Sequence, residues 1–107
     1  MIMPLTRPFR ETLHANLQRD PAFREALLTD AIGLLLSGDV QTGKAVLRDY
    51  INSTIGFTEL SARTGSPSKS LMRMFSPSGN PPARALFTAI RELQAASGVV
   101  LELKRAA

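Results

Sequence analysis

Residues 57–76 read FTELSARTGSPSKSLMRMFS and contain two short helical patterns separated by a glycine. In the first pattern Leu60 is an apolar inward position, and Ser61 is small enough for two helices to cross closely. Gly65 can adopt the left-handed backbone of a tight turn. A two-helix unit this short cannot bury itself. The stretch therefore predicts a helix-turn-helix carried by a larger helical domain, although such pairs also occur as ordinary packing.

The second short helix is expected to start at Ser66–Pro67, a capping residue followed by proline at the first helical position. Its inward face would consist of Leu71, Met74 and Phe75. Pro67, Ser68, Lys69, Met72 and Arg73 then remain outward near its start. In a helix-turn-helix, the N-terminal residues of the second helix face base edges in the major groove of DNA.

Residue chemistry suggests roles on such a duplex. Lys69 and Arg73 can donate to guanine acceptors or phosphates, Ser68 can contact either, and Met72 can rest against a thymine methyl group. Arg63 and Arg84 are expected on phosphates, together with the helix start at Asn80. The candidate DNA-binding residues are Arg63, Ser66, Pro67, Ser68, Lys69, Ser70, Met72, Arg73, Asn80 and Arg84.

The net charge of +4 comes entirely from the second half of the chain. Up to Gly56 there are six basic and six acidic residues, whereas no acidic residue lies between Glu59 and Glu92. The basic residues of that interval are Arg63, Lys69, Arg73, Arg84 and Arg91. A stretch of one sign spread over helices is typical of a phosphate-facing surface, with a merely solvated basic face as the alternative.

Four further helices are predicted around this unit, each from a start signal, and the last three also from a glycine that stops them. The first opens at Thr6 with Pro8, the second runs from Asp20–Pro21 to about Ser37, the third runs from Asp39 to about Thr54, and the last runs from Asn80–Pro81 to about Ser97. The apolar positions expected to face inward are Phe9, Leu13 and Leu17; Phe23, Ala26, Leu27, Ala31, Leu34 and Leu35; Val40, Val46, Leu47, Tyr50 and Ile51; and Leu86, Phe87, Ile90 and Leu93.

The pattern changes after Gly98 to VVLELK, residues 99–104, in which apolar residues alternate with period two. This predicts a short strand. An isolated strand is not stable alone, so we expect it to pair with a second copy of the chain or with a different protein. A loosely packed tail is the alternative.

Several features exclude other classes of protein. The chain has no cysteine, which fits a reducing compartment, and its longest apolar run is far below the roughly 20 residues that span a bilayer. Gly38–Lys44 has the spacing of a phosphate-binding loop, but Ala45 follows instead of a hydroxyl residue and the preceding segment is helical, so we interpret it as a helix end and a cap. His14 is the only histidine and has no catalytic partners in view. We expect a cytoplasmic protein without enzymatic activity, metal or cofactor.

The stretch TGSPSKSLMRMFSPSGNP, followed by ARALFTAIRELQAASGVVLEL, resembles the addiction-module antidote proteins of the helix-turn-helix class, which are small antitoxins of RelE/HigB-type toxins. The matching places are Thr64–Gly65, Ser70–Leu71, Ser76–Pro77 and Gly79–Asn80–Pro81, and the resemblance covers Phe23 to Lys104. Ser66 and Pro67 depart from the family pattern and shift the expected start of the recognition helix one residue earlier. The helix around residues 9–17 lies outside that pattern.

Together these patterns predict an all-α, single domain over residues 1–107, with a lambda-repressor-like helix-turn-helix bundle. Residues 1–55 would supply helices for packing or dimerisation, residues 56–97 the DNA-binding unit, and residues 99–104 the terminal strand. The expected function is a dimeric transcriptional regulator on a double-stranded DNA operator. The resemblance implies an antitoxin with a RelE/HigB-like toxin as partner. The alternatives are a stand-alone repressor and a protein-interaction module that binds no DNA.

Overall fold

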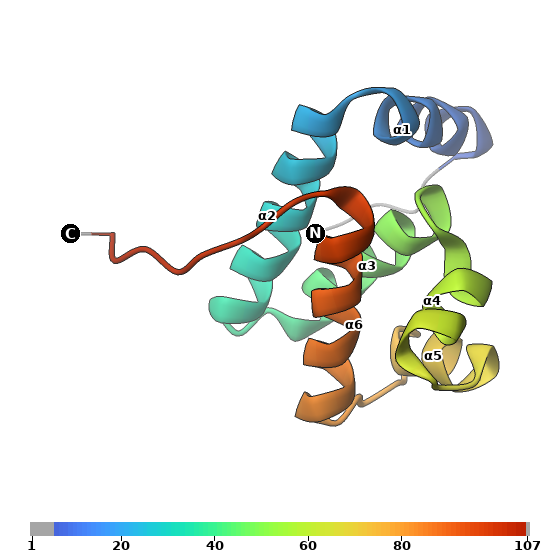
Figure 1. Cartoon of the computed structure of the whole chain (residues 1–107), viewed down its shortest axis with the longest axis vertical. Coiled ribbons are helices and arrows are strands. Elements are labelled where there is room, and N and C mark those ends of the chain that lie inside the picture. The colour runs from blue at the N-terminus through green and yellow to red at the C-terminus, as the bar shows by residue number, and fades with distance from the viewer. Residues whose placement is uncertain (1–5, 107) are drawn as a thin grey trace.

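The described part of this chain is a bundle of packed helices. The structure is a computed structural model that describes residues 6–106. Within these residues there are six helices: α1 (Arg7–Arg19), α2 (Pro21–Leu36), α3 (Val40–Ser53), α4 (Gly56–Thr64), α5 (Ser68–Met74) and α6 (Ala83–Ser97). α3 contacts α1, α2 and α4, and α6 packs along α2 and α4 (Figure 1). The predicted all-α class is confirmed.

Three of the predicted helix starts form as expected, because a side-chain oxygen accepts free backbone N–H groups of the first turn. The hydroxyl of Thr6 accepts from the Phe9 N–H at 3.3 Å. The carboxylate of Asp20 accepts from Ala22 at 3.0 Å, and that of Asp39 accepts from Thr42 at 3.2 Å. The predicted starts of α1, α2 and α3 are therefore confirmed, and α2 and α3 each end within a residue of the predicted position.

The predicted caps at Ser66 and Asn80 are wrong. The N-caps are Pro67 and Pro82, both in extended conformation and without a side-chain cap. Ser66 is engaged in the preceding turn, where its N–H donates to the Thr64 hydroxyl at 3.3 Å. Asn80 is followed by two prolines, and a residue before proline is pushed out of the helical region, so α6 can begin only after the second one.

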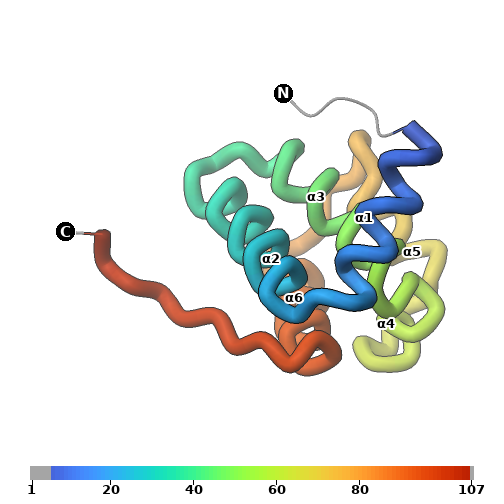
Figure 2. Tube along the Cα trace, turned by 90° about the horizontal axis from the view of Figure 1, so that it is seen from above, coloured from blue at the N-terminus to red at the C-terminus, as the bar shows by residue number. Residues whose placement is uncertain are grey.

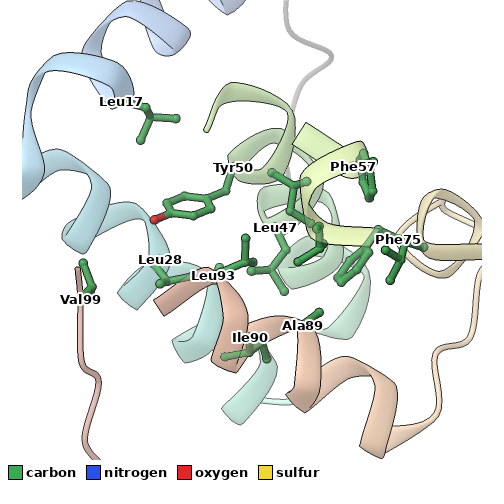
Figure 3. Close-up of a cluster of buried hydrophobic side chains, with 14 residues drawn as sticks. Leu17, Leu28, Leu47, Tyr50, Phe57, Phe75, Ala89, Ile90, Leu93 and Val99 are labelled. Atoms are coloured by element: carbon green, nitrogen blue, oxygen red, sulfur yellow. The ribbon is translucent and has the colours of Figure 1, made fainter. Parts of the chain in front are cut away.

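The core is a single apolar cluster to which all six helices contribute (Figure 3). Tyr50 of α3 lies fully buried within it, and its hydroxyl pairs with the hydroxyl of Ser97 at the end of α6. Fully buried side chains of this kind stabilise by about 1.5–3 kcal/mol each. The buried members are Leu17, Leu28, Ala31, Leu47, Tyr50, Ile51, Phe57, Leu60, Leu71, Phe75, Ala89, Ile90, Leu93 and Val99.

Some of the predicted inward positions are instead exposed, because apolar residues spaced four apart do not stay on one side of a helix with 3.6 residues per turn. Phe9 is 56% exposed: two steps of four residues rotate it by roughly 80° from the buried Leu17. Phe87 is 63% exposed and lies at the edge of the stripe that α6 buries. Val40 and Ala26 are also exposed, whereas Leu28, absent from the predicted stripe, is fully buried.

The predicted terminal strand is not formed: residues 6–106 contain no strand. Val99 is buried and the Leu101 N–H donates to the side-chain oxygen of Gln94 at 2.8 Å, which holds the start of the segment on α6. The following residues project from the helical body, and both Val100 and Leu103 are 84% exposed (Figures 1 and 2). A strand needs a neighbouring strand for its backbone hydrogen bonds, and the described chain offers none. Pairing with a second copy stays a prediction.

Among the described helices, none combines the length and the apolar character that crossing a bilayer would require.

Candidate nucleic-acid interface

The helices α4 and α5 are joined by a turn of three residues. Gly65 ends α4 with φ 79° and ψ 4°, the left-handed conformation that glycine adopts without steric cost. The turn is held from both sides: the Ser61 hydroxyl donates to the Ser66 carbonyl at 2.6 Å, and the Ser68 hydroxyl donates to the Phe57 carbonyl at 3.4 Å. These bonds tie the turn and the beginning of α5 to α4.

Packing fixes which side of α5 faces outward. Leu71 and Phe75 are buried, and the Phe75 ring lies 6.3 Å from the Phe57 ring at an interplanar angle of 51°. Aromatic pairs in tilted arrangements of this distance contribute about 0.5–1.5 kcal/mol beyond their burial. Leu60 of α4 is fully buried as well. The predicted inward face of α5 is confirmed, with Met74 half-buried at its edge.

The opposite side of α5 carries two cations without an acidic partner. Lys69 and Arg73 are exposed and stand one helical turn apart, and no ion pair within residues 6–106 includes either of them. Two like charges at this spacing destabilise a helix by about 0.2–0.5 kcal/mol. Met72 lies between them and is 53% exposed. Such a surface is complementary to an anionic ligand that also offers apolar contacts.

The remaining predicted residues on the turn and on α5 are less accessible. Pro67 is exposed, whereas Ser66, Ser68 and Ser70 are half-buried. The bonds of Ser66 and Ser68 to α4 occupy the Ser66 carbonyl and the Ser68 hydroxyl.

Arg63, Asn80 and Arg84 lie on the elements that precede and follow α5 in the chain. Arg63 lies in the last turn of α4 and pairs with Glu59 at 3.0 Å, so a phosphate would compete with this carboxylate. Asn80 is exposed in the connector between α5 and α6, directly after Gly79, whose backbone approaches the Arg73 carbonyl. Arg84 is exposed in the first turn of α6. The connector therefore brings Asn80 toward the C-terminal end of α5.

One charged residue near this surface was not predicted. Lys44 of α3 is 1% exposed, and its ammonium group donates to the carbonyls of Ser76, at 3.0 Å, and Gly79. Both carbonyls belong to the turn that follows α5. The sequence did carry a signal, because Lys44 stands four residues after Val40 and three before Leu47 on the expected inward face of α3.

Compared with protein-family models, with curated proteins and with solved structures, the chain matches none.

Proposed function

We propose that this chain is a sequence-specific DNA-binding regulator that reads the major groove with α5. The observation that carries the proposal is the exposed side of α5, where Lys69, Met72 and Arg73 lie together and neither cation has an acidic partner among the described residues. The opposite side of α5 packs against α4. In this interpretation α4 and α5 are the two helices of a lambda-repressor-like helix-turn-helix.

The proposed contacts follow from chemistry and position. Arg73 and Lys69 would donate to guanine acceptors or to phosphates, and Met72 would rest against a thymine methyl group. Asn80 and Arg84, which follow α5 in the chain, would contact the phosphate backbone and set the register. Arg63 would join them by exchanging Glu59 for a phosphate oxygen.

Selection from a library of random DNA duplexes tests the proposal. We expect enrichment of a defined sequence, and fluorescence anisotropy on the enriched duplex should show affinity that falls steeply between about 50 and 200 mM KCl. A scrambled duplex of equal length is the control and should bind more weakly at each salt concentration. If no sequence is enriched and all duplexes bind alike, α5 does not read bases.

We further propose a homodimer in which residues 99–104 of two copies pair as antiparallel strands. Val100 and Leu103 are each 84% exposed in the single chain, and pairing would cover apolar surface and satisfy backbone groups together. A two-fold axis would then present two α5 helices to half-sites about 34–36 Å apart. Slow amide exchange at Val99–Leu103 in the dimer is expected; fast exchange there would exclude this pairing.

An antitoxin role rests on the resemblance to addiction-module antidotes. We propose that the chain represses its own promoter and neutralises a RelE/HigB-like toxin. If a small gene beside its own encodes a protein that arrests growth, co-expression of this chain should relieve the arrest. A neighbouring gene product without such an effect would favour a stand-alone repressor.

A protein-interaction module is the second candidate function, and one observation favours it. Phe87 of α6 is 63% exposed, and aromatic side chains are enriched at protein–protein interfaces relative to the rest of the surface. In that case the duplex selection would fail, while Phe87→Ala would weaken binding to the partner. The two candidates are thereby distinguished.

A further inference from the structure

Lys44 is a charge in the interior without a counter-ion. It is 1% exposed, and none of the ion pairs within residues 6–106 includes it. Lysine is almost never fully buried unless it is paired, because removing an ammonium group from water costs several kcal/mol. Here two backbone carbonyls, those of Ser76 and Gly79, take the place of a carboxylate.

These carbonyls belong to a turn that folds back onto the end of α5. The Ser76 hydroxyl donates to the Arg73 carbonyl at 2.6 Å, and the Gly79 N–H donates to the Ser76 carbonyl at 3.0 Å. Gly79 lies so close that a Cβ atom on it would stand 2.0 Å from the Arg73 carbonyl oxygen. The turn is thus closed around the backbone of Arg73.

The position of the ammonium group is also favourable for α5. The C-terminal end of a helix carries partial negative charge, so a cation placed there stabilises the helix. Because the Lys44 stem is fixed in α3, whose buried side chains belong to the apolar core, its two hydrogen bonds connect the turn after α5 to the core of the molecule.

We propose that Lys44 is a positioning residue of the DNA-binding surface: by holding the turn Ser76–Gly79, it fixes the orientation in which α5 presents Arg73. This inference rests on the proposed function. Loss of the ammonium group frees the turn, and the last turn of α5 then samples several orientations. Base contacts require one orientation, whereas attraction to phosphates does not, so sequence discrimination suffers more than overall DNA affinity.

Three variants separate positioning from stability. Lys44→Met keeps the shape of the stem and removes the charge and the donors. Lys44→Arg keeps the charge and the donors, and its side chain would lie beside an open hollow lined by Lys44, Arg48 and Phe75. Leu28→Ala, in the core on α2, is the control because it destabilises the fold at a helix that packs against α1, α3 and α6.

The readout is the ratio of affinities for the library-selected duplex and its scrambled counterpart, measured at a temperature where circular dichroism shows each variant folded. We expect Lys44→Met to lower this ratio about tenfold or more, Lys44→Arg to restore most of it, and Leu28→Ala to keep the wild-type ratio. If Lys44→Met keeps the ratio, or if Leu28→Ala lowers it equally, Lys44 has no positioning role.

Amide hydrogen exchange gives a second readout that does not involve DNA. In Lys44→Met the amides of Ser76 and Gly79 should exchange faster while those of α2 stay unchanged; uniform acceleration would overturn the proposal. If the wild type does not discriminate between duplexes, the DNA-binding proposal fails, and this exchange pattern still decides whether Lys44 holds the turn. Should Lys44→Met not fold, Gly79→Ala disturbs the same turn and should lower the affinity ratio with Lys44 intact.

Discussion

Replacing Gly79 with alanine should destabilise the fold through close contacts with the backbone of α5. An alanine Cβ at this position would stand 2.0 Å from the Arg73 carbonyl oxygen and 2.6 Å from that of Met74. Both are backbone atoms and cannot turn away as a side chain would. The backbone of Gly79 does not have positive φ, so the requirement for glycine here is the close approach itself and not an unusual conformation.

The size of the effect can be worked out from the bonds that the displaced turn would lose. Moving the chain to ordinary contact distance breaks the bond from the Gly79 N–H to the Ser76 carbonyl and the bond from Lys44 to the Gly79 carbonyl. A neutral hydrogen bond contributes about 0.5–1.5 kcal/mol and a charged one about 1.5–3 kcal/mol. The expected loss is therefore about 2–4 kcal/mol, which lowers Tm by roughly 10 °C or more.

Gly33→Ala is the matched control, since the chemical change is identical. Gly33 lies in α2, and no neighbouring atom comes within 4 Å of the place where a Cβ would stand, so alanine there should stabilise the protein by about 0.5–1 kcal/mol. Urea and thermal unfolding followed by far-ultraviolet circular dichroism measure both variants. If Gly79→Ala is as stable as Gly33→Ala, the turn after α5 is not packed as described.

Three other outcomes are expected. Leu71→Ala should cost about 2–5 kcal/mol in urea unfolding because Leu71 is buried, whereas Met72→Ala next to it should stay within about 0.5 kcal/mol; equal costs would contradict the orientation of α5. Burial raises the pKa of Asp49 above its ordinary 3.8, although nearby Arg48 acts in the opposite direction. The native state therefore binds the proton more tightly than the unfolded state, and the free energy of unfolding should fall as pH rises through the window above 3.8. Asp49→Asn should abolish this pH dependence. Burial likewise raises the pKa of Tyr50 above 10.0, so the free energy of unfolding should fall as pH rises beyond 10.0. Tyr50→Phe should remove that loss while costing about 1 kcal/mol at neutral pH. An unchanged pH dependence above 10.0 in Tyr50→Phe would contradict the burial of the phenol.

The helices could be predicted from the sequence because the signals that start and end them are local. Capping by Thr6, Asp20 and Asp39, together with the glycine after α4, depends on a few neighbouring residues. The errors lie where a non-local effect or a second rule competes. Two consecutive prolines displaced the start of α6 from Asn80, and the C-terminal alternation could not produce a strand where the described chain offers no partner strand.

The exposed side of α5 was also accessible to prediction, since burial of Leu71 and Phe75 leaves Lys69 and Arg73 on the outside. The role of Lys44 was not. Its partners are backbone carbonyls more than thirty positions away, and a carbonyl looks the same in every residue of the sequence. The sequence indicated a buried charge only through the position of Lys44 on the side of α3 that was expected to face inward.

The comparison of two arginine variants on the selected duplex tests most directly whether α5 reads DNA. Arg73 lies on the outward side of α5, whereas Arg7 lies on α1, apart from α5, so Arg73→Ala and Arg7→Ala change the net charge equally at different places (Figure 1). In fluorescence anisotropy we expect Arg73→Ala to weaken specific binding by about 1–3 kcal/mol and Arg7→Ala to leave it unchanged. Equal losses, or none for Arg73→Ala, would contradict the assignment of α5 as the recognition helix.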